Sequence, residues 1–306
     1  MSDDVLRYGK TNDHVTSWAL RNFPAAKFNP LTFCCTPVEL LSNDGKDGVC
    51  GWGSGFFWKF NEEAYLITNW HVVSQKDFFT RECINCNAYV PLRLRIRGLQ
   101  IHTENGFVRI DRPTITMDLD EENHRKLFAS PWRINDTEVD IVAIPCRSEY
   151  VVRKNSDRRL FKGSESLTCF ANESAESKIA TGVGDDCFVL GYPLQNYEGL
   201  MPPVWKRGTI ASETQMGVAG RPAFLVDASV GSGMSGSPII RKITTFVSHD
   251  AATGVIEEHS AYAVIGVYAG RLKSNNDLRA NIGYGWYEVL IDELLTESKH
   301  TWSQRP

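Results

Sequence analysis

The stretch that most constrains this chain is the short segment 230–238, which reads Val-Gly-Ser-Gly-Met-Ser-Gly-Ser-Pro. Glycine adopts backbone conformations with φ > 0 and lets another chain approach closely, so this composition predicts a tight turn. A serine held between glycines can present its hydroxyl while neighbouring N–H groups point into one small space. Acyl transfer needs that arrangement, a nucleophile beside donors for the oxyanion that it creates. An ordinary Gly/Ser hairpin turn is the alternative, and the rest of the chain decides between them.

Two upstream segments supply possible partners for Ser235. Residues 64–73 read as a buried strand that ends in His71, and residues 138–145 place Asp140 at the head of a β-branched strand. The resulting order His, Asp, Ser is that of the chymotrypsin-type triad. Asp136 is a rival for the acid, but it lies in a loop-like Asn-Asp-Thr, whereas Asp140 is better placed to be buried beneath the histidine.

These three segments together resemble the motifs of the trypsin-like, or chymotrypsin-like, serine peptidases. Residues 68–72 look like the histidine motif, residues 140–143 like the aspartate motif and residues 233–238 like the serine motif. The resemblance covers roughly residues 31–299 and is closest to the non-secreted bacterial trypsin-like peptidase domains. It implies a serine endopeptidase in which His71, Asp140 and Ser235 form the catalytic triad. It also implies that the N–H groups of Gly233 and Ser235 form the oxyanion hole.

The same resemblance suggests where a peptide substrate binds. In this family the floor of the primary specificity pocket lies six residues before the nucleophile, which is Ser229 here, with Val230 beside it. Neither residue is charged, so we expect a preference for uncharged, small or apolar side chains and a penalty for buried Lys or Arg. The backbone of Gly266, Val267 and Tyr268 is expected to offer an edge to an extended peptide. Plain core is the equal alternative for that strand.

The predicted fold class is all-β, with two packed antiparallel β-barrels of the chymotrypsin type and a short C-terminal helix. Short strands with one wet face, separated by turns, argue for barrels and against βαβ units. We expect an N-terminal extension over 1–30, with a short helix at 14–21. The first barrel, carrying His71 and Asp140, is expected over 31–145, and the second barrel with Ser235 and the helix over 146–306.

Composition narrows the remaining classes of function. The chain has 306 residues and a net charge of −4 without a basic run, so no nucleic-acid partner is expected. The longest apolar run, 261–270, is too short to span a bilayer, so no membrane partner is expected. Acidic residues near the start argue against a signal peptide, which predicts a cytoplasmic, reducing location. The expected partner is a polypeptide substrate; the sequence does not identify a regulatory partner.

Cysteine usage predicts no metal and no cofactor. The eight cysteines show no evenly spaced framework, so they read as buried free thiols. Cys83 and Cys86 form a lone C-x-x-C motif, and a zinc site would require a second pair at a suitable spacing.

Two other functions remain open from the sequence. The first is a catalytically silent peptide-binding module on the same fold. The second is a serine esterase of the α/β-hydrolase type, which needs G-x-S-x-G, but position 237 is serine. Its acid and histidine would have to follow the nucleophile, where Asp250 with His259 or His300 could serve.

Met234 stands where secreted, zymogen-activated relatives carry aspartate, which predicts that no proteolytic maturation is needed.

Overall fold

The structure is a computed structural model of the whole chain. It describes residues 29–42, 48–84, 91, 93–97, 100–104, 107–111, 114–119, 130–146, 169–171, 181–193, 202–250, 255–272 and 281–302. The possible helix at 14–21 and Cys86 lie outside the described residues. No helix within these ranges is long and apolar enough to cross a membrane.

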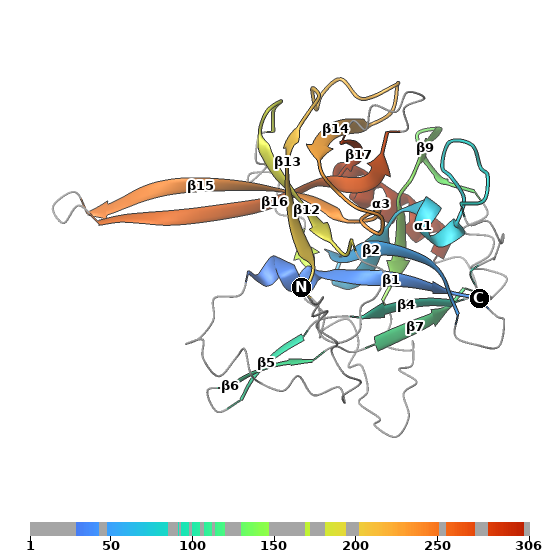
Figure 1. Cartoon of the computed structure of the whole chain (residues 1–306), viewed down its shortest axis with the longest axis horizontal. Coiled ribbons are helices and arrows are strands. Elements are labelled where there is room, and N and C mark those ends of the chain that lie inside the picture. The colour runs from blue at the N-terminus through green and yellow to red at the C-terminus, as the bar shows by residue number, and fades with distance from the viewer. Residues whose placement is uncertain are drawn as a thin grey trace, which may run out of the picture.

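The N-terminal half forms a seven-stranded sheet that curves into half a barrel (Figure 1). Its strands follow the order β10-β3-β2-β1-β4-β7, and β11 pairs in parallel with β2. The strand bounds are β1 (Cys35–Leu41), β2 (Val49–Phe60), β3 (Glu63–Thr68), β4 (Arg93–Arg97), β7 (Thr114–Asp118), β10 (Val142–Pro145) and β11 (Phe170–Ala171). Although β11 follows residue 146, the expected start of the second barrel, it extends the first sheet.

The C-terminal half forms a closed barrel in the order β12-β13-β14-β17-β16-β15. The bounds are β12 (Asp186–Gly191), β13 (Val204–Ile210), β14 (Ala223–Ala228), β15 (Pro238–Asp250), β16 (Val255–Arg271) and β17 (Ile282–Tyr287). Strands β15 and β16 form a long hairpin that projects well beyond the barrel (Figure 1).

Short elements connect and cover the two sheets. They are the 3-10 helix η2 (Pro30–Cys34), helix α1 (Trp70–Ser74), the hairpin of β5 (Gln100–Glu104) and β6 (Phe107–Asp111), the hairpin of β8 (Trp132–Ile134) and β9 (Thr137–Val139), and the C-terminal helix α3 (Val289–Trp302). Helix α3 belongs to the second half in sequence but reaches the first sheet, where Trp58 Nε1 donates to Asp292 Oδ1 at 3.0 Å.

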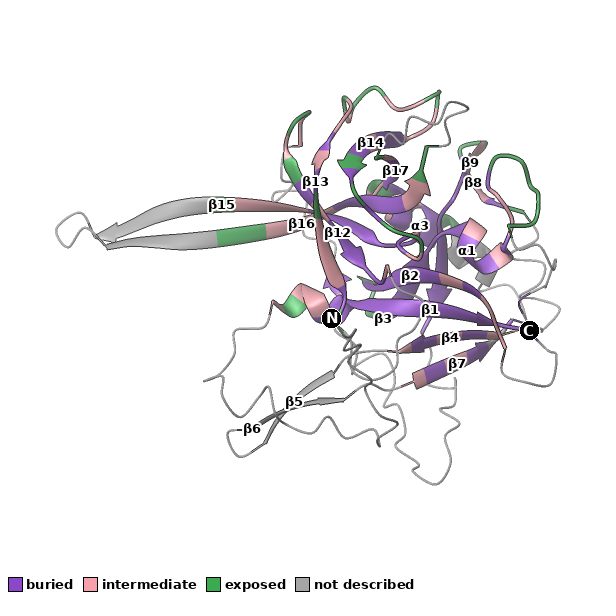
Figure 2. Ribbon diagram, in the orientation of Figure 1, coloured by how far each residue is buried: buried purple, intermediate pink, exposed green. Residues whose placement is uncertain are grey.

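Local sequence explains where the first sheet begins. A strand is expected over 31–41, but the chain first makes the single turn η2, because Pro30 fits the first helical position and the side chain of Asn29 accepts from the Leu31 N–H. All seven residues of β1 are then buried (Figure 2). Its one acid, Glu39, is paired with Arg95 and Arg97, as a buried carboxylate requires.

The predicted fold class is confirmed. The chain is mostly β, with the chymotrypsin-like arrangement of two barrel-like sheets and one C-terminal helix. Two apolar clusters underlie it: a large one beneath the first sheet and α3, and a smaller one inside the closed barrel that includes Val230, Met234 and Tyr268. The segment with Ser235 joins β14 to β15 in the closed barrel.

Candidate active site

His71 lies in the one-turn helix α1, at the end of a strand of the first sheet. The strand was expected to continue as far as the histidine, but β3 ends at Thr68. The extended backbone of Asn69 then begins the helix, which places Trp70 in the core and leaves the His71 side chain 15% exposed. The helix ends at Gln75, which is in the left-handed conformation.

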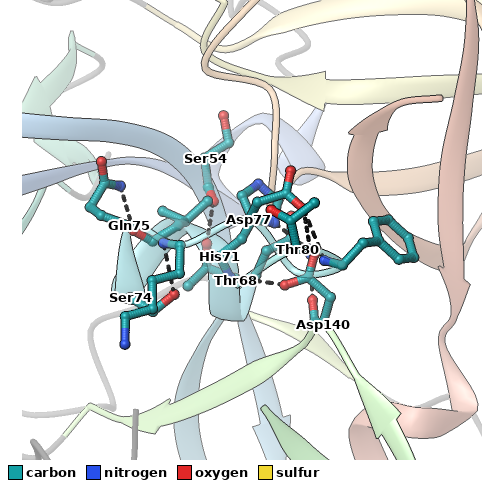
Figure 3. Close-up of polar contacts among 12 residues, drawn as sticks. Ser54, Thr68, His71, Ser74, Gln75, Asp77, Thr80 and Asp140 are labelled. Atoms are coloured by element: carbon teal, nitrogen blue, oxygen red, sulfur yellow. Dashed lines mark hydrogen bonds and ion pairs between the residues drawn. The ribbon is translucent and has the colours of Figure 1, made fainter. Parts of the chain in front are cut away.

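Asp140 holds His71 through two hydrogen bonds (Figure 3). Its Oδ1 accepts from the His71 backbone N–H at 2.9 Å, and its Oδ2 lies 2.6 Å from His71 Nδ1. Val142 of β10 pairs with Thr68 of β3, so continuing this register brings Asp140 level with α1. The Asp140 side chain is only 3% exposed, and its carbonyl accepts from Asn69 Nδ2 at 2.6 Å. Because a carboxylate only accepts, the proton of this bond is on Nδ1, and in the neutral tautomer that fits the bond Nε2 is the acceptor nitrogen.

The rival acid, Asp136, lies elsewhere. It occupies the turn between β8 and β9, exposed to solvent and with φ of 63°. The structure therefore brings His71 together with Asp140, whereas Asp136 is an exposed turn residue.

Ser235 lies in a turn that only glycine could build. Gly233 and Gly236 have φ of 92° and 87°. A Cβ on Gly233 would lie 2.7 Å from the Tyr192 carbonyl oxygen, and one on Gly236 would lie 2.1 Å from the Ser54 carbonyl oxygen. Both positions combine a left-handed backbone with a close approach of another chain, which explains the composition of this segment.

The turn lies close to the strand and helix that lead to His71. Thr68, three residues before the histidine, lies with its Oγ1 2.3 Å from the place of a Cβ on Gly236. A Cβ on Gly53 would lie 2.6 Å from Cγ1 of Val72 and 3.2 Å from the Ser235 carbonyl oxygen. Thr68 and Val72, which flank His71 in the sequence, therefore lie close to Gly236 and Gly53, and both glycines are also next to Ser235.

Two backbone donors in the turn are unused. Within the described part of the chain, the N–H groups of Gly233 and Ser235 have no acceptor, whereas those of Gly236 and Ser237 donate to the carbonyls of Tyr268 and Met234. The Ser235 side chain is partly exposed. Gly270 is its neighbour from β16, since a Cβ there would lie 3.7 Å from Ser235 Oγ.

Ser229 and Val230 differ in exposure. Ser229 is exposed, whereas Val230 is 1% exposed and packs in the smaller apolar cluster with Met234. A positive charge lies beside them that no local sequence pattern indicated: the guanidinium of Arg271 donates to the Val230 carbonyl oxygen. The immediate surroundings are thus polar and cationic, in addition to the apolar valine.

The expected substrate edge at Gly266, Val267 and Tyr268 requires a correction. Gly266 and Val267 pair with β15 on one side and β17 on the other, so their edges are occupied. Tyr268 pairs with Gly285, while its N–H and C=O bond to the serine turn at 2.8 Å each. The register breaks after Tyr268, and among the described residues Ala269 and Gly270 pair with no residue of β15 or β17. The free edge is therefore one step further along β16.

The Tyr268 side chain is part of the barrel interior. It is 1% exposed, packs against Gly283 of β17 and has no hydrogen-bond partner for its hydroxyl within the described residues. Burial raises the pKa of Tyr268 to about 12, partly offset by the nearby positive charge of Arg271. Tyr268 is thus a neutral phenol at ordinary pH.

The described cysteines behave as thiols. Seven of them are in no disulfide: Cys34, Cys35, Cys50, Cys83, Cys146, Cys169 and Cys187. Burial raises the pKa of the Cys146 and Cys187 thiols to about 12 and that of Cys169 to about 11, so these groups stay protonated and unreactive. Across the described ranges, no three His, Cys, Asp or Glu side chains are grouped to hold a metal ion.

Sequence reasoning missed Ser54, which contacts the nucleophile turn from the first sheet. Its N–H donates to the Ser235 carbonyl and its hydroxyl to the Gly233 carbonyl, each at 2.8 Å. The available signal was its position between Gly53 and Gly55, which is similar to the glycine-rich surroundings of Ser235, where Gly233 and Gly236 flank Met234 and Ser235.

Comparison with known proteins places this arrangement in a family. No curated protein matches the sequence. Among solved structures, a serine-to-alanine mutant of Rv3671c from M. tuberculosis H37Rv, in its inactive form, is similar with a TM-score of 0.41, 13% identity and 90% of each chain covered. An inactive form of the Rv3671c protease is similar with a TM-score of 0.38 and 13% identity, covering 87% of this chain and 89% of that one. The family model of the trypsin-like peptidase domain matches residues 53–247, which is more than half of the sequence and includes His71, Asp140 and Ser235. This chain therefore belongs to the trypsin-like peptidase domain family.

Proposed function

We propose that the protein is a serine endopeptidase that cleaves polypeptides through a triad of His71, Asp140 and Ser235. The observation that carries this proposal is the pair of hydrogen bonds between His71 and Asp140, at 2.9 and 2.6 Å, on a helix that lies beside Gly53, as the serine turn also does. Family membership supports peptidase activity, and the paired histidine supports the serine mechanism.

In the proposed reaction Ser235 Oγ attacks the carbonyl carbon of the scissile bond. His71 Nε2 takes the hydroxyl proton and later donates it to the leaving amine. Asp140 keeps the proton on Nδ1 and stabilises the imidazolium that forms. Water then attacks the acyl-enzyme, with His71 again as the base, and releases the second peptide product.

The backbone would stabilise the charge that develops on the carbonyl oxygen. The unused N–H groups of Gly233 and Ser235 are the proposed donors. A preorganised donor of this kind contributes about 3 to 4 kcal/mol to transition-state stabilisation.

The proposed substrate is an extended polypeptide next to β16. Ala269 and Gly270, which have no partner in the register of either neighbouring strand, are suited to strand addition, and a Cβ on Gly270 would lie 3.7 Å from Ser235 Oγ. Ser229 and Val230 remain the proposed pocket residues, with Tyr268 behind them. Arg271 adds a positive charge there, which increases the expected penalty for Lys and Arg side chains.

A fluorophosphonate probe tests the proposal, followed by peptide cleavage. We expect the purified protein to be labelled and to cleave peptides, and Ser235→Ala and His71→Ala each to remove nearly all activity. A catalytically silent peptide-binding module would take no label. An esterase would take the label and hydrolyse simple esters but not peptides, so either result would refute the endopeptidase.

We also propose a cytoplasmic location. Buried free thiols such as Cys34 and Cys35 support a reducing compartment. Fluorescence microscopy of the tagged protein in its own cells would test this, and export from the cytoplasm would contradict it.

A further inference from the structure

Ser54 connects the first sheet to both sides of the nucleophile. It is fully buried on β2, and four of its polar contacts are defined. Its N–H donates to the Ser235 carbonyl and its Oγ to the Gly233 carbonyl, each at 2.8 Å. Its Oγ accepts from the Tyr192 N–H at 2.9 Å. Its carbonyl accepts from Thr68 Oγ1 at 2.7 Å, as Figure 3 shows.

These contacts fix two peptide groups on either side of a third. Each peptide group is planar, so anchoring the Gly233 carbonyl fixes the plane of the 233–234 unit, and anchoring the Ser235 carbonyl fixes the 235–236 unit. The unit between them, 234–235, carries the Ser235 N–H. Gly233 has φ of 92° and no side chain to restrict its rotation, so its carbonyl needs an external anchor.

We propose that Ser54 is a positioning residue for the oxyanion donors. It holds the Ser235 N–H in the direction in which the developing oxyanion needs it, and it does so from the half of the molecule that carries His71. The inference rests on the proposed function, because the donors matter only if Ser235 is the nucleophile. It adds a residue 179 positions from Gly233 in the sequence to the machinery of the reaction.

A purely structural role is the competing explanation, and Ser237 provides the matched control. Both hydroxyls are fully buried, and both face Gly191, where a Cβ would lie 2.7 Å from Ser54 Oγ and 2.0 Å from Ser237 Oγ. The Ser237 hydroxyl, however, has no hydrogen-bond partner within the described residues. Replacement by alanine removes the same atom at both sites, but only at Ser54 does it release the Gly233 carbonyl.

The experiment compares Ser54→Ala and Ser237→Ala with the wild-type full chain. For Ser54→Ala we expect kcat on a cleaved peptide to fall about 10- to 100-fold, part of the loss caused by deleting one oxyanion donor. We expect KM to stay within about twofold, because substrate binding does not use the oxyanion, and the fluorophosphonate labelling rate to fall with kcat. Ser237→Ala should keep both rates within about twofold.

Three results would overturn the inference. They are an unchanged kcat in Ser54→Ala, an equal loss in Ser237→Ala, or a loss confined to KM. If Ser54→Ala fails to fold, Ser54→Cys keeps the shape with a weaker donor and carries the same test, with lower kcat and unchanged KM expected. A wild-type protein that neither takes the label nor cleaves peptides would instead refute the proposed function itself.

Discussion

Asp140 contacts His71 at two points, through the backbone N–H at 2.9 Å and through ring Nδ1 at 2.6 Å. The first bond orients helix α1 against the acid, and the second sets the tautomer of the ring. The Asp140 side chain therefore fixes both the position of His71 and the tautomer of its ring. Because the two bonds use different oxygens of Asp140, a mutation can change one bond and keep the other.

Asp140→Asn should reduce kcat by about 10⁴, because an amide nitrogen facing Nδ1 favours the wrong tautomer. The Asn carbonyl can still accept from the His71 N–H, so we expect little change in urea midpoint. Asp136→Asn is the control and should be mild, since Asp136 is an exposed turn residue and Asn tolerates its positive φ. Peptide-cleavage kinetics of both variants check this, and a larger loss in Asp136→Asn would contradict the assignment.

Gly236→Ala should disable the nucleophile turn. An added Cβ would lie 2.1 Å from the Ser54 carbonyl oxygen and 2.3 Å from Thr68 Oγ1, on a backbone with φ of 87°. We expect a loss of more than about 3 kcal/mol in the free energy of unfolding, together with loss of labelling.

Gly184→Ala separates the two causes. Gly184 has nearly the same φ, 85°, but a Cβ there would meet no atom within 4 Å. We expect this substitution to lower the free energy of unfolding only through the strain of a left-handed backbone, by about 1 to 2 kcal/mol, and labelling to be retained. Urea unfolding measures both variants; equal losses would mean that close packing against Ser54 and Thr68 does not constrain the turn.

The sequence predicted those parts of the site that depend on local patterns. The order of His71, Asp140 and Ser235 and the glycine turn could be read directly, since turn chemistry and strand alternation are local properties. The hydrogen bond from Ser54 to Gly233 could not, because it joins residues 179 positions apart. The same reason explains the error at Gly266 and Val267: whether a strand edge is free depends on which distant strands pair with it.

Arg271 should influence specificity beside the proposed pocket. Its guanidinium bonds to the Val230 carbonyl oxygen, so a substrate Lys or Arg placed there would meet a like charge. Arg271→Glu should raise the relative kcat/KM for a Lys substrate by about fivefold or less, because Arg271 is exposed and its field is screened.

A peptide library with one varied position measures this change. Arg207→Glu serves as the control, since Arg207 is an exposed arginine paired with Asp186 on β12. An equal change in both variants would indicate a general charge effect, and a wild-type preference for cleavage after Lys or Arg would refute the proposed pocket.

Chelators should leave the activity unchanged. The proposed triad uses no metal, and within the described ranges no group of ligands is assembled to hold one. Cleavage rates with and without EDTA test this expectation. A loss with EDTA that zinc restores would show that a metal site contributes.

Met234, next to the nucleophile, should remove the need for proteolytic activation. A zymogen-type switch buries a new N-terminal amine against a carboxylate at this position. Met234 is fully buried among Val230, Ile239 and Tyr268, and a thioether cannot compensate a buried amine for its lost water. We therefore expect the fluorophosphonate-labelled protein to have the mass of the uncut chain plus the probe.

Met234→Leu should retain labelling, whereas Met234→Asp should lose both stability and labelling, because its carboxylate would be buried without a partner. Labelling found only on a shortened chain, or increased by Met234→Asp after cleavage, would show that this serine turn is ordered by a new terminus after all.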